Sequence, residues 1–169
     1  TDAKARRSAA FALGKLGPRA SAARPALKTA FGAEKDALVR EAIVSALGEI
    51  CRDDAMARKD QSLEKLFLTA LQDSDPRLRR SGAFALGCLA SKTEDTRREL
   101  EDALSTDKEA IVRQNAAWAL GQFGDLALPA LARGLRDPDS LVKRDAARSL
   151  LQCSDGDKVH ALLKDLLAL

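Results

Sequence analysis

One ten-residue segment of the chain, Leu78-Arg-Arg-Ser-Gly-Ala-Phe-Ala-Leu-Gly87, consists of small and apolar residues that follow a basic pair. Four other segments align with it without gaps: Ala5-Arg-Arg-Ser-Ala-Ala-Phe-Ala-Leu-Gly14, Val39-Arg-Glu-Ala-Ile-Val-Ser-Ala-Leu-Gly48, Val112-Arg-Gln-Asn-Ala-Ala-Trp-Ala-Leu-Gly121 and Val142-Lys-Arg-Asp-Ala-Ala-Arg-Ser-Leu-Leu151. The basic residue at the second position sets a common register, with spacings of 34, 39, 34 and 30 residues. Periods of this length are typical of solenoids, in which each repeat stacks on its neighbours.

Each repeated segment predicts a helix, because alanine and leucine favour helices and a glycine near the end permits a close approach or a helix end. An acidic turn precedes four of the five segments, at Asp36, Asp73 to Pro76, Asp107, and Asp137-Pro138-Asp139. Aspartate accepts hydrogen bonds from the free N–H groups at a helix start, and proline tolerates the first turn. We expect these motif helices near residues 5–16, 38–50, 77–89, 109–122 and 140–152.

A second set of helices is expected between the motif helices, at Ala22 to Phe31, Ser62 to Leu71, Thr96 to Leu104 and Leu126 to Leu135, with a last one at Lys158 to Leu169. The polar stretch from Cys51 to Gln61 accounts for the longest spacing and predicts an enlarged loop, which is either a neutral insertion or a partner contact. The predicted fold is all-α, a right-handed α-solenoid of about five helical hairpins that forms a single array over residues 1–169.

The motif V-R-x-x-A-A-x-A-L-G-x-L-G after an acidic turn resembles the HEAT repeat, particularly its short bacterial type. The resemblance covers nearly the whole chain, and the fifth copy departs from it at Lys143 and Leu151. It implies that the motif helices line the concave side, so we call them inner helices, and that the other helices lie on the convex side. The chain begins on an inner helix and ends on an outer one, which suggests a fragment of a longer array.

The composition indicates a folded protein, with 46% hydrophobic and 31% charged residues. The net charge of +3 is too small to imply nucleic-acid binding by itself. Three widely spaced cysteines, Cys51, Cys88 and Cys153, form neither a zinc motif nor a disulfide framework. Reduced thiols, together with the lack of a signal peptide or a long apolar run, lead us to expect a cytoplasmic protein without a membrane segment.

The apolar motif positions form one arc on a helix that turns about 100° per residue, and this arc includes the register residue. We therefore expect the register arginines to be structural, bonded to carbonyls or to the turn aspartates while their stems pack between repeats. Four variable positions lie at about 100–200° from the register residue, opposite the core. We call them the inner stripe, and its residues are Arg7, Glu41, Arg80, Gln114, Arg144; Ser8, Ala42, Ser81, Asn115, Asp145; Phe11, Ser45, Phe84, Trp118, Arg148; Lys15, Glu49, Cys88, Gln122 and Gln152.

Aromatic residues occupy one position of the inner stripe in three repeats, at Phe11, Phe84 and Trp118. Either these rings pack onto the adjacent repeat, or they form an exposed strip that binds a partner together with nearby arginines. The acidic residues Glu41 and Glu49 of the second repeat would interrupt a phosphate-binding track, which favours a protein ligand. The candidate partner-binding residues are Arg7, Phe11, Arg80, Phe84, Gln114, Trp118, Arg144 and Arg148.

Catalytic motifs are absent from the sequence: it contains no phosphate-binding loop, no G-x-S-x-G and no H-E-x-x-H, and His160 is its single histidine. We therefore expect no catalytic residue, metal or cofactor. The HEAT resemblance leaves three hypotheses. The first is a non-enzymatic scaffold that binds a protein or peptide, the second is a bilin-binding protein similar to phycobilin lyases, and the third, disfavoured by charge, is a nucleic-acid-binding protein. The repeated His-Glu pairs of the di-iron deoxyhypusine hydroxylases are missing.

The last predicted helix carries Leu162, Leu163, Leu166 and Leu167, which no later repeat covers in this chain. This arrangement predicts exposed apolar surface or self-association through that helix.

Overall fold

A computed structural model describes the backbone of residues 2–167 and the side chains of residues 2–164. The chain divides into two compact units, Thr1–Ser91 and Lys92–Leu169, and each is described here by itself. Both units consist of helices and connecting turns, without a β-strand in the described residues. The all-α fold of helical hairpins predicted from the repeats is therefore confirmed. That the five hairpins form one continuous array stays a prediction.

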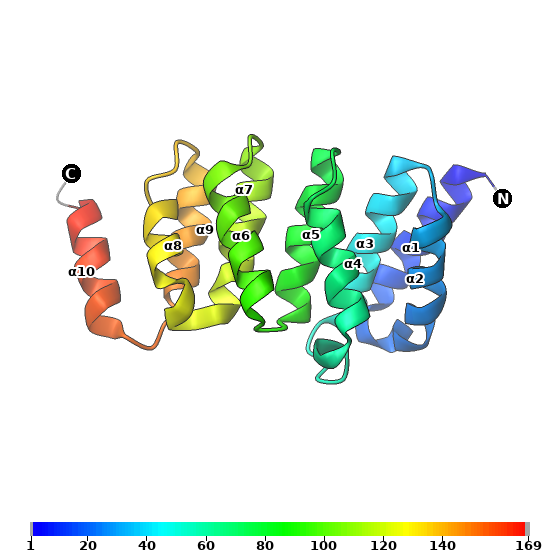
Figure 1. The fold of residues 1–169 in the computed structure, drawn as a ribbon, viewed down its shortest axis with the longest axis horizontal. Coiled ribbons are helices and arrows are strands. Elements are labelled where there is room, and N and C mark those ends of the chain that lie inside the picture. Colours follow the sequence, from blue (N-terminus) through cyan, green and yellow to red (C-terminus); the bar gives the residue numbers. More distant parts are fainter. Residues whose placement is uncertain (1, 168–169) are drawn as a thin grey trace. The chain divides into compact units, whose positions relative to one another are not determined.

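The first unit places three inner helices side by side, with two outer helices against them (Figure 1). The inner helices are α1 (Ala3–Leu16), α3 (Ala37–Cys51) and α5 (Pro76–Leu89), and the outer ones are α2 (Arg24–Ala33) and α4 (Gln61–Leu71). A 3₁₀ segment, η1 (Gly17–Ala23), connects α1 to α2. Because α3 lies between α1 and α5, it contributes residues such as Val44, Leu47 and Ile50 that are completely buried.

The second unit repeats this arrangement with inner helices α7 (Ala110–Leu120) and α9 (Ser140–Leu150). Its outer helices are α6 (Glu94–Thr106) and α8 (Leu128–Gly134), and a 3₁₀ segment, η3 (Gly121–Ala127), connects α7 to α8. The last helix is α10 (Gly156–Leu167). Helices are thus present at all the predicted inner and outer positions, and their described ends lie within a few residues of the expected ones. The expected end of the last helix, Leu169, lies outside the described residues.

Glycines of the repeated motif let neighbouring inner helices approach closely. A Cβ atom added to Gly48 would lie 2.9 Å from the Cα atom of Ala85, and one added to Gly121 would lie 3.0 Å from the Cβ atom of Ser149. Distances this short are incompatible with an added methyl group unless a helix shifts. Glycine at this motif position therefore lets consecutive inner helices pack together, and the last copy has Leu151, which is exposed.

The acidic turns begin several helices as the sequence predicts. The carboxylates of Asp36, Asp75 and Asp139 accept hydrogen bonds from backbone N–H groups in the first turns of α3, α5 and α9. The prediction is wrong for α7, whose N-cap is Glu109 without a side-chain bond. Asp107 instead accepts from the backbone N–H of Glu109, because it lies two residues before that cap.

The enlarged loop between α3 and α4 is an ordered turn. It contains a 3₁₀ segment, η2 (Ala57–Lys59), whose first N–H groups are accepted by Asp54. Asp54 also forms an ion pair with Arg24, the first residue of α2, with an N–O distance of 2.9 Å. At the far end of the loop, Asp60 pairs with Lys28 of α2. These contacts explain why the insertion leaves the stacking of α3 and α5 intact.

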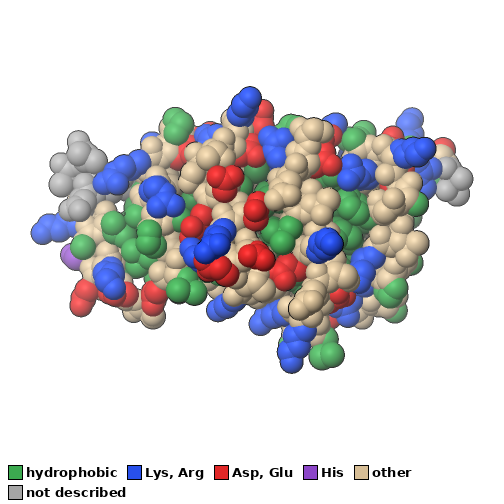
Figure 2. Space-filling view, viewed as in Figure 1, with side chains coloured by type: hydrophobic (Ala, Val, Ile, Leu, Met, Phe, Trp, Pro, Cys, Tyr) green, Lys and Arg blue, Asp and Glu red, His purple; other side chains and the backbone are tan. Residues whose placement is uncertain are grey.

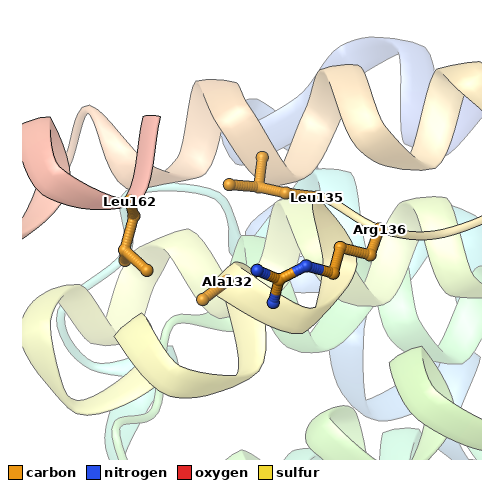
Figure 3. A pocket seen from close by; sticks show the side chains of 4 residues that line it. All are labelled: Ala132, Leu135, Arg136 and Leu162. Carbon is orange, nitrogen blue, oxygen red and sulfur yellow. The ribbon is translucent and has the colours of Figure 1, made fainter. Parts of the chain in front are cut away.

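The last helix, α10, covers the second unit only lightly. Among its described side chains only Val159 is buried, while Leu162 and Leu163 are partly exposed. Leu162 faces Ala132, Leu135 and Arg136 at a small gap beside α8 (Figure 3). The expected apolar exposure is thus observed in part for Leu162 and Leu163, whereas the side chains of Leu166 and Leu167 lie outside the described residues.

Candidate functional site

The register arginines join consecutive repeats, as the sequence predicts. Arg6 of α1 donates two hydrogen bonds to the Glu34 carboxylate before α3, at 2.6 and 3.0 Å. Arg40 of α3 lies 3.0 Å from Asp73, in the turn before α5. The two-point contact of Arg6 fixes orientation as well as distance, and both arginines connect one repeat to the next.

The second unit contains the same connection between α7 and the turn before α9. Arg113 donates to both carboxylate oxygens of Asp137, at 2.7 and 3.0 Å, and to the backbone carbonyls of Asp107 and Lys108. These contacts lower the pKa of Asp137 despite its burial. Lys143, the register residue of the fifth repeat, is exposed, in keeping with the weaker motif there.

The inner stripe of the first unit has an exposed basic and aromatic edge on α1. Arg7, Phe11 and Lys15 follow one another at intervals of four residues, so they share one face of the helix. Phe11 is 62% exposed, and the Lys15 ammonium lies 5.1 Å from the centre of its ring. This edge offers a cation and an apolar surface together.

The acidic residues of the second repeat do not remain as free negative charge. Glu41 accepts a hydrogen bond from Arg80 at 2.6 Å and another from Ser81 at 3.0 Å. Glu49 forms an ion pair with Arg52 at 3.1 Å. The predicted acidic interruption of the inner stripe is therefore neutralised within the first unit.

Phe84 packs between repeats rather than standing free. A Cβ atom added to Gly48 would lie 3.5 Å from its ring, and the Arg52 guanidinium lies 5.6 Å from the ring centre. The aromatic column thus divides between the two alternatives, because Phe11 is exposed whereas Phe84 and Trp118 are only partly so. Three positions assigned to the inner stripe are in fact buried, namely Ala42, Ser81 and Cys88.

The inner stripe of the second unit is organised around one carboxylate. Asp145 accepts a hydrogen bond from the Gln114 amide at 2.7 Å and one from the Arg144 guanidinium at 2.8 Å. Gln114 lies on α7 and the other two on α9, so the contact ties the two inner helices. Burial works to raise the pKa of Asp145, but the bonds from Arg144 and Gln114 outweigh it and hold the pKa below its usual value. The exposed Arg148 lies one turn beyond Arg144.

Two exposed apolar residues on this surface were not among the predicted residues. Ile111 of α7 and Leu141 of α9 are 44% and 46% exposed. Each precedes its register residue by two positions, which places it at about 160°, inside the angular range of the inner stripe. Extending the helical register by two residues at its start would have identified both from the sequence.

The cysteine and histidine side chains, which could serve catalysis or metal binding, do not all lie together in the described part of the chain. Cys51 and Cys88 are buried, and loss of hydration raises the pKa of their thiols to about 11 and about 12. His160 is exposed on α10. The described residues contain no cluster of histidine, cysteine and carboxylate side chains that could hold a metal ion. Among these same residues, no helix is long and apolar enough to cross a membrane.

The outer helices present a different surface. Lysine, arginine and carboxylate side chains are intermixed over them, and acidic side chains gather over α6 (Figure 2). Three arginine–glutamate pairs within one helix account for much of that surface, from Arg97 to Glu94 and Glu101, and from Arg98 to Glu94. These pairs neutralise only part of the charge, because α6 has five carboxylates and two arginines within its bounds, so it keeps an excess of acidic side chains.

Comparison with known proteins supports the repeat assignment. A family model described as HEAT repeats matches residues 63–151 and 99–168, and one described as PBS lyase HEAT-like repeat matches residues 5–32. No curated protein matches the chain.

Two solved structures illustrate the fold similarity. An engineered protein from a structural genomics consortium has a TM-score of 0.68 and 20% identity, over 99% of this chain and 81% of the other. A designed armadillo repeat protein in complex with the peptide (KR)4 has a TM-score of 0.64 and 14% identity, over 92% of this chain and 79% of the other. Identities this low establish the fold alone. With the family model matching more than half of its length, the chain belongs to the HEAT-repeat family.

Proposed function

We propose that this protein is a non-enzymatic HEAT-repeat scaffold, acting in the cytoplasm, that binds a protein or peptide segment through the concave face lined by its inner helices. The observation that carries this proposal is the exposure of large apolar side chains on the outward side of those helices. Phe11 on α1, Ile111 on α7 and Leu141 on α9 each expose between two fifths and two thirds of their surface. Exposed apolar groups beside arginines are typical of protein interfaces.

The arginines that stabilise the fold are different residues from those that are exposed on the inner stripe. The register arginines Arg6, Arg40 and Arg113 form ion pairs between repeats. The exposed stripe residues Arg7 and Arg148 lie outside these pairs. On one inner helix, therefore, some residues stabilise the fold and other residues are exposed to a partner. A substitution on the inner stripe can therefore remove binding without removing the fold.

Selection from a random peptide library displayed on phage would test this proposal. The target is the whole chain, and enriched peptides are then measured against a variant with Ile111→Ser and Leu141→Ser. We expect the variant to keep its helical circular dichroism and to lose these peptides. The matched control carries Met56→Ser and Leu126→Ser, which replace side chains at least as exposed, 73% and 66%, outside the inner helices. The control should bind normally.

Two outcomes would contradict the proposal. If no peptide is enriched on the wild-type chain, the inner face does not act as a peptide-binding surface. If the enriched peptides bind the Ile111→Ser, Leu141→Ser variant as well as the wild type, they bind elsewhere.

A bilin-binding role is a second candidate, favoured by the match of residues 5–32 to the PBS lyase HEAT-like repeat. A tetrapyrrole would lie against Phe11, with its propionates near Arg7 and Lys15. Added phycocyanobilin would then give a visible difference spectrum that Phe11→Ala reduces. An unchanged pigment spectrum would end this candidate.

A further inference from the structure

The two inner helices of the second unit place equivalent residues next to one another. Helices α7 and α9 pack side by side, and their registers pair Ile111 with Leu141, Gln114 with Arg144, and Trp118 with Arg148. The first pair is apolar and exposed to almost the same extent on both helices. The surface therefore has two apolar residues, Ile111 and Leu141, near the starts of the helices. Trp118 and the two arginines, Arg144 and Arg148, lie further along. We call these six residues the α7–α9 patch.

The exposed charge of the α7–α9 patch is positive. Asp145 is the single carboxylate within the bounds of α7 and α9, and its side chain is 14% exposed because it is covered by Gln114 and Arg144. The Arg144 side chain remains 50% exposed despite that contact. Arg148 is exposed and makes no ion pair with any side chain that the structure describes. Within the bounds of α7 and α9, a ligand would therefore meet exposed guanidinium groups and no exposed carboxylate.

We propose that the α7–α9 patch binds an acidic peptide segment whose carboxylates alternate with bulky apolar side chains. This inference rests on the proposed peptide-binding function and specifies the partner. A carboxylate would pair with Arg148, which is exposed and makes no ion pair with a described side chain, although its charge acts on Asp145. The exposed side of Arg144 would pair with a second carboxylate. Apolar side chains of the peptide would cover Ile111, Leu141 and the exposed part of Trp118.

The spacing of the patch suits an extended peptide. Packed helices lie about 8–10 Å apart, and an extended chain advances about 3.3 Å per residue. A peptide that crosses from α7 to α9 thus places every third residue over equivalent positions. The repeat Leu-Glu-Asp-Leu-Glu-Asp-Leu meets this condition with an apolar residue every three positions.

The exposed apolar pair, Ile111 and Leu141, favours a peptide ligand over a nucleic acid. Ile111 and Leu141 offer nothing to a phosphate backbone, and two accessible arginines are too few for the phosphate contacts that dominate nucleic-acid affinity. The designed armadillo protein of similar fold was solved with a basic peptide, (KR)4. The charge on this patch predicts the opposite preference.

Fluorescence anisotropy of labelled peptides with the whole chain tests this proposal. The probes are the acidic peptide above, its Lys/Arg counterpart, its Gln/Asn counterpart, and an acidic version with serine in place of leucine. We expect the acidic leucine peptide to bind at least about tenfold more tightly than each of the others at 50 mM NaCl. Binding should weaken at 300 mM NaCl, because salt screens the arginine–carboxylate attraction.

The sharpest variant is Arg148→Glu, because it reverses the charge of an exposed arginine that makes no ion pair with any described side chain. It should weaken the acidic peptide at least about tenfold and shift preference toward the Lys/Arg peptide. Arg133→Glu is the matched control, since Arg133 is an exposed arginine on the outer helix α8. The control should leave the affinity for the acidic peptide within about twofold of wild type. Circular dichroism confirms the fold of both variants.

Several results would overturn the inference while leaving the proposed function in place. These are equal binding of the Gln/Asn peptide, tighter binding of the Lys/Arg peptide, or an acidic-peptide affinity that Arg148→Glu does not change. Tighter binding of a twelve-residue oligothymidine than of the acidic peptide would assign the patch to nucleic acid. Failure of all these probes to bind would overturn the inference. The proposed function itself is removed only by the two outcomes of the phage selection given above.

Discussion

The carboxylate of Glu34 illustrates how one residue of a turn joins two repeats. It accepts two hydrogen bonds from Arg6 and one each from the backbone N–H groups of Lys35 and Asp36. The Arg6 guanidinium, followed by these backbone N–H groups, lowers the pKa of Glu34 from 4.5 to about 2. A depressed pKa means that the unfolded chain binds the proton more readily than the folded one.

The stability contributed by ionised Glu34 should therefore be fully present above about pH 4.5 and disappear as the pH falls toward 2. We expect Glu34→Gln to lower the free energy of unfolding at pH 6 and to have a progressively smaller effect below pH 4.5. Urea denaturation followed by circular dichroism at several pH values measures this. A difference between variant and wild type that stays constant from pH 6 to pH 3 would show that the Glu34 charge is irrelevant.

The three thiols should differ in reactivity. Burial raises the pKa of the Cys51 and Cys88 thiols to about 11 and about 12, whereas Cys153 is only partly buried. Because the thiolate is the reactive form, Ellman's reagent at pH 8 should modify Cys153 first and the other two only after denaturation. Cys153→Ser should abolish the rapid phase. Rapid modification of more than one thiol in the native protein would contradict the buried placement of Cys51 and Cys88.

Where the backbones of two helices approach each other closely, glycine is required at the contact. A Cβ atom at Gly82 of α5 would lie 2.5 Å from the backbone nitrogen of Leu71 at the end of α4. A backbone atom cannot rotate away, so α4 and α5 would have to separate. We expect Gly82→Ala to lower the free energy of unfolding by about 1–3 kcal/mol.

Gly32 supplies the matched control for Gly82. It lies in α2, and an added Cβ atom would meet no atom within 4 Å. Gly32→Ala should be neutral or stabilising by up to about 1 kcal/mol, because alanine loses less backbone entropy on folding. Urea denaturation of both variants gives the comparison, and equal effects of the two substitutions would refute the close approach of α4 and α5.

The helices were predictable from the sequence because the motif repeats and its glycines, alanines and acidic turns have local causes. The ion pairs from Arg6, Arg40 and Arg113 to the next turn were also predictable, since a buried arc cannot contain an unpaired arginine. The solvent exposure of individual side chains was harder to predict from the sequence. Phe11 and Phe84 occupy the same motif position, yet Phe84 lies against Gly48 of the preceding inner helix and has Arg52 near its ring. Among the described residues no inner helix precedes α1, and Phe11 is exposed.

The polar contacts on the inner stripe were not predictable from helical angles. Glu41 was expected to interrupt the inner stripe and Asp145 was placed on it, but each accepts a hydrogen bond from the adjacent inner helix. A register analysis places residues on one helix and carries no information about which side chains on two helices meet. That information came from the packing of α3 on α5 and of α7 on α9.

The whole molecule should lose structure from its ends, because a repeat in a solenoid is stabilised by its neighbours. In α1 only Ala10 is buried, and among the described side chains of α10 only Val159 is, whereas most of α3 and α5 is buried. Hydrogen–deuterium exchange should therefore be fastest in peptides from α1 and α10 and slowest in α3 and α5. Exchange in α10 as slow as in α5 would contradict this order.

The location of the binding surface can be tested with the single tryptophan of the chain, Trp118, which lies in the α7–α9 patch. Titration with the unlabelled acidic leucine peptide, which contains no aromatic residue, can be followed by tryptophan emission and by quenching with acrylamide. We expect a saturable blue shift and reduced quenching at the concentrations that saturate anisotropy, and neither change in Arg148→Glu. Binding seen by anisotropy without any change in Trp118 emission or quenching would place the peptide elsewhere and contradict the account.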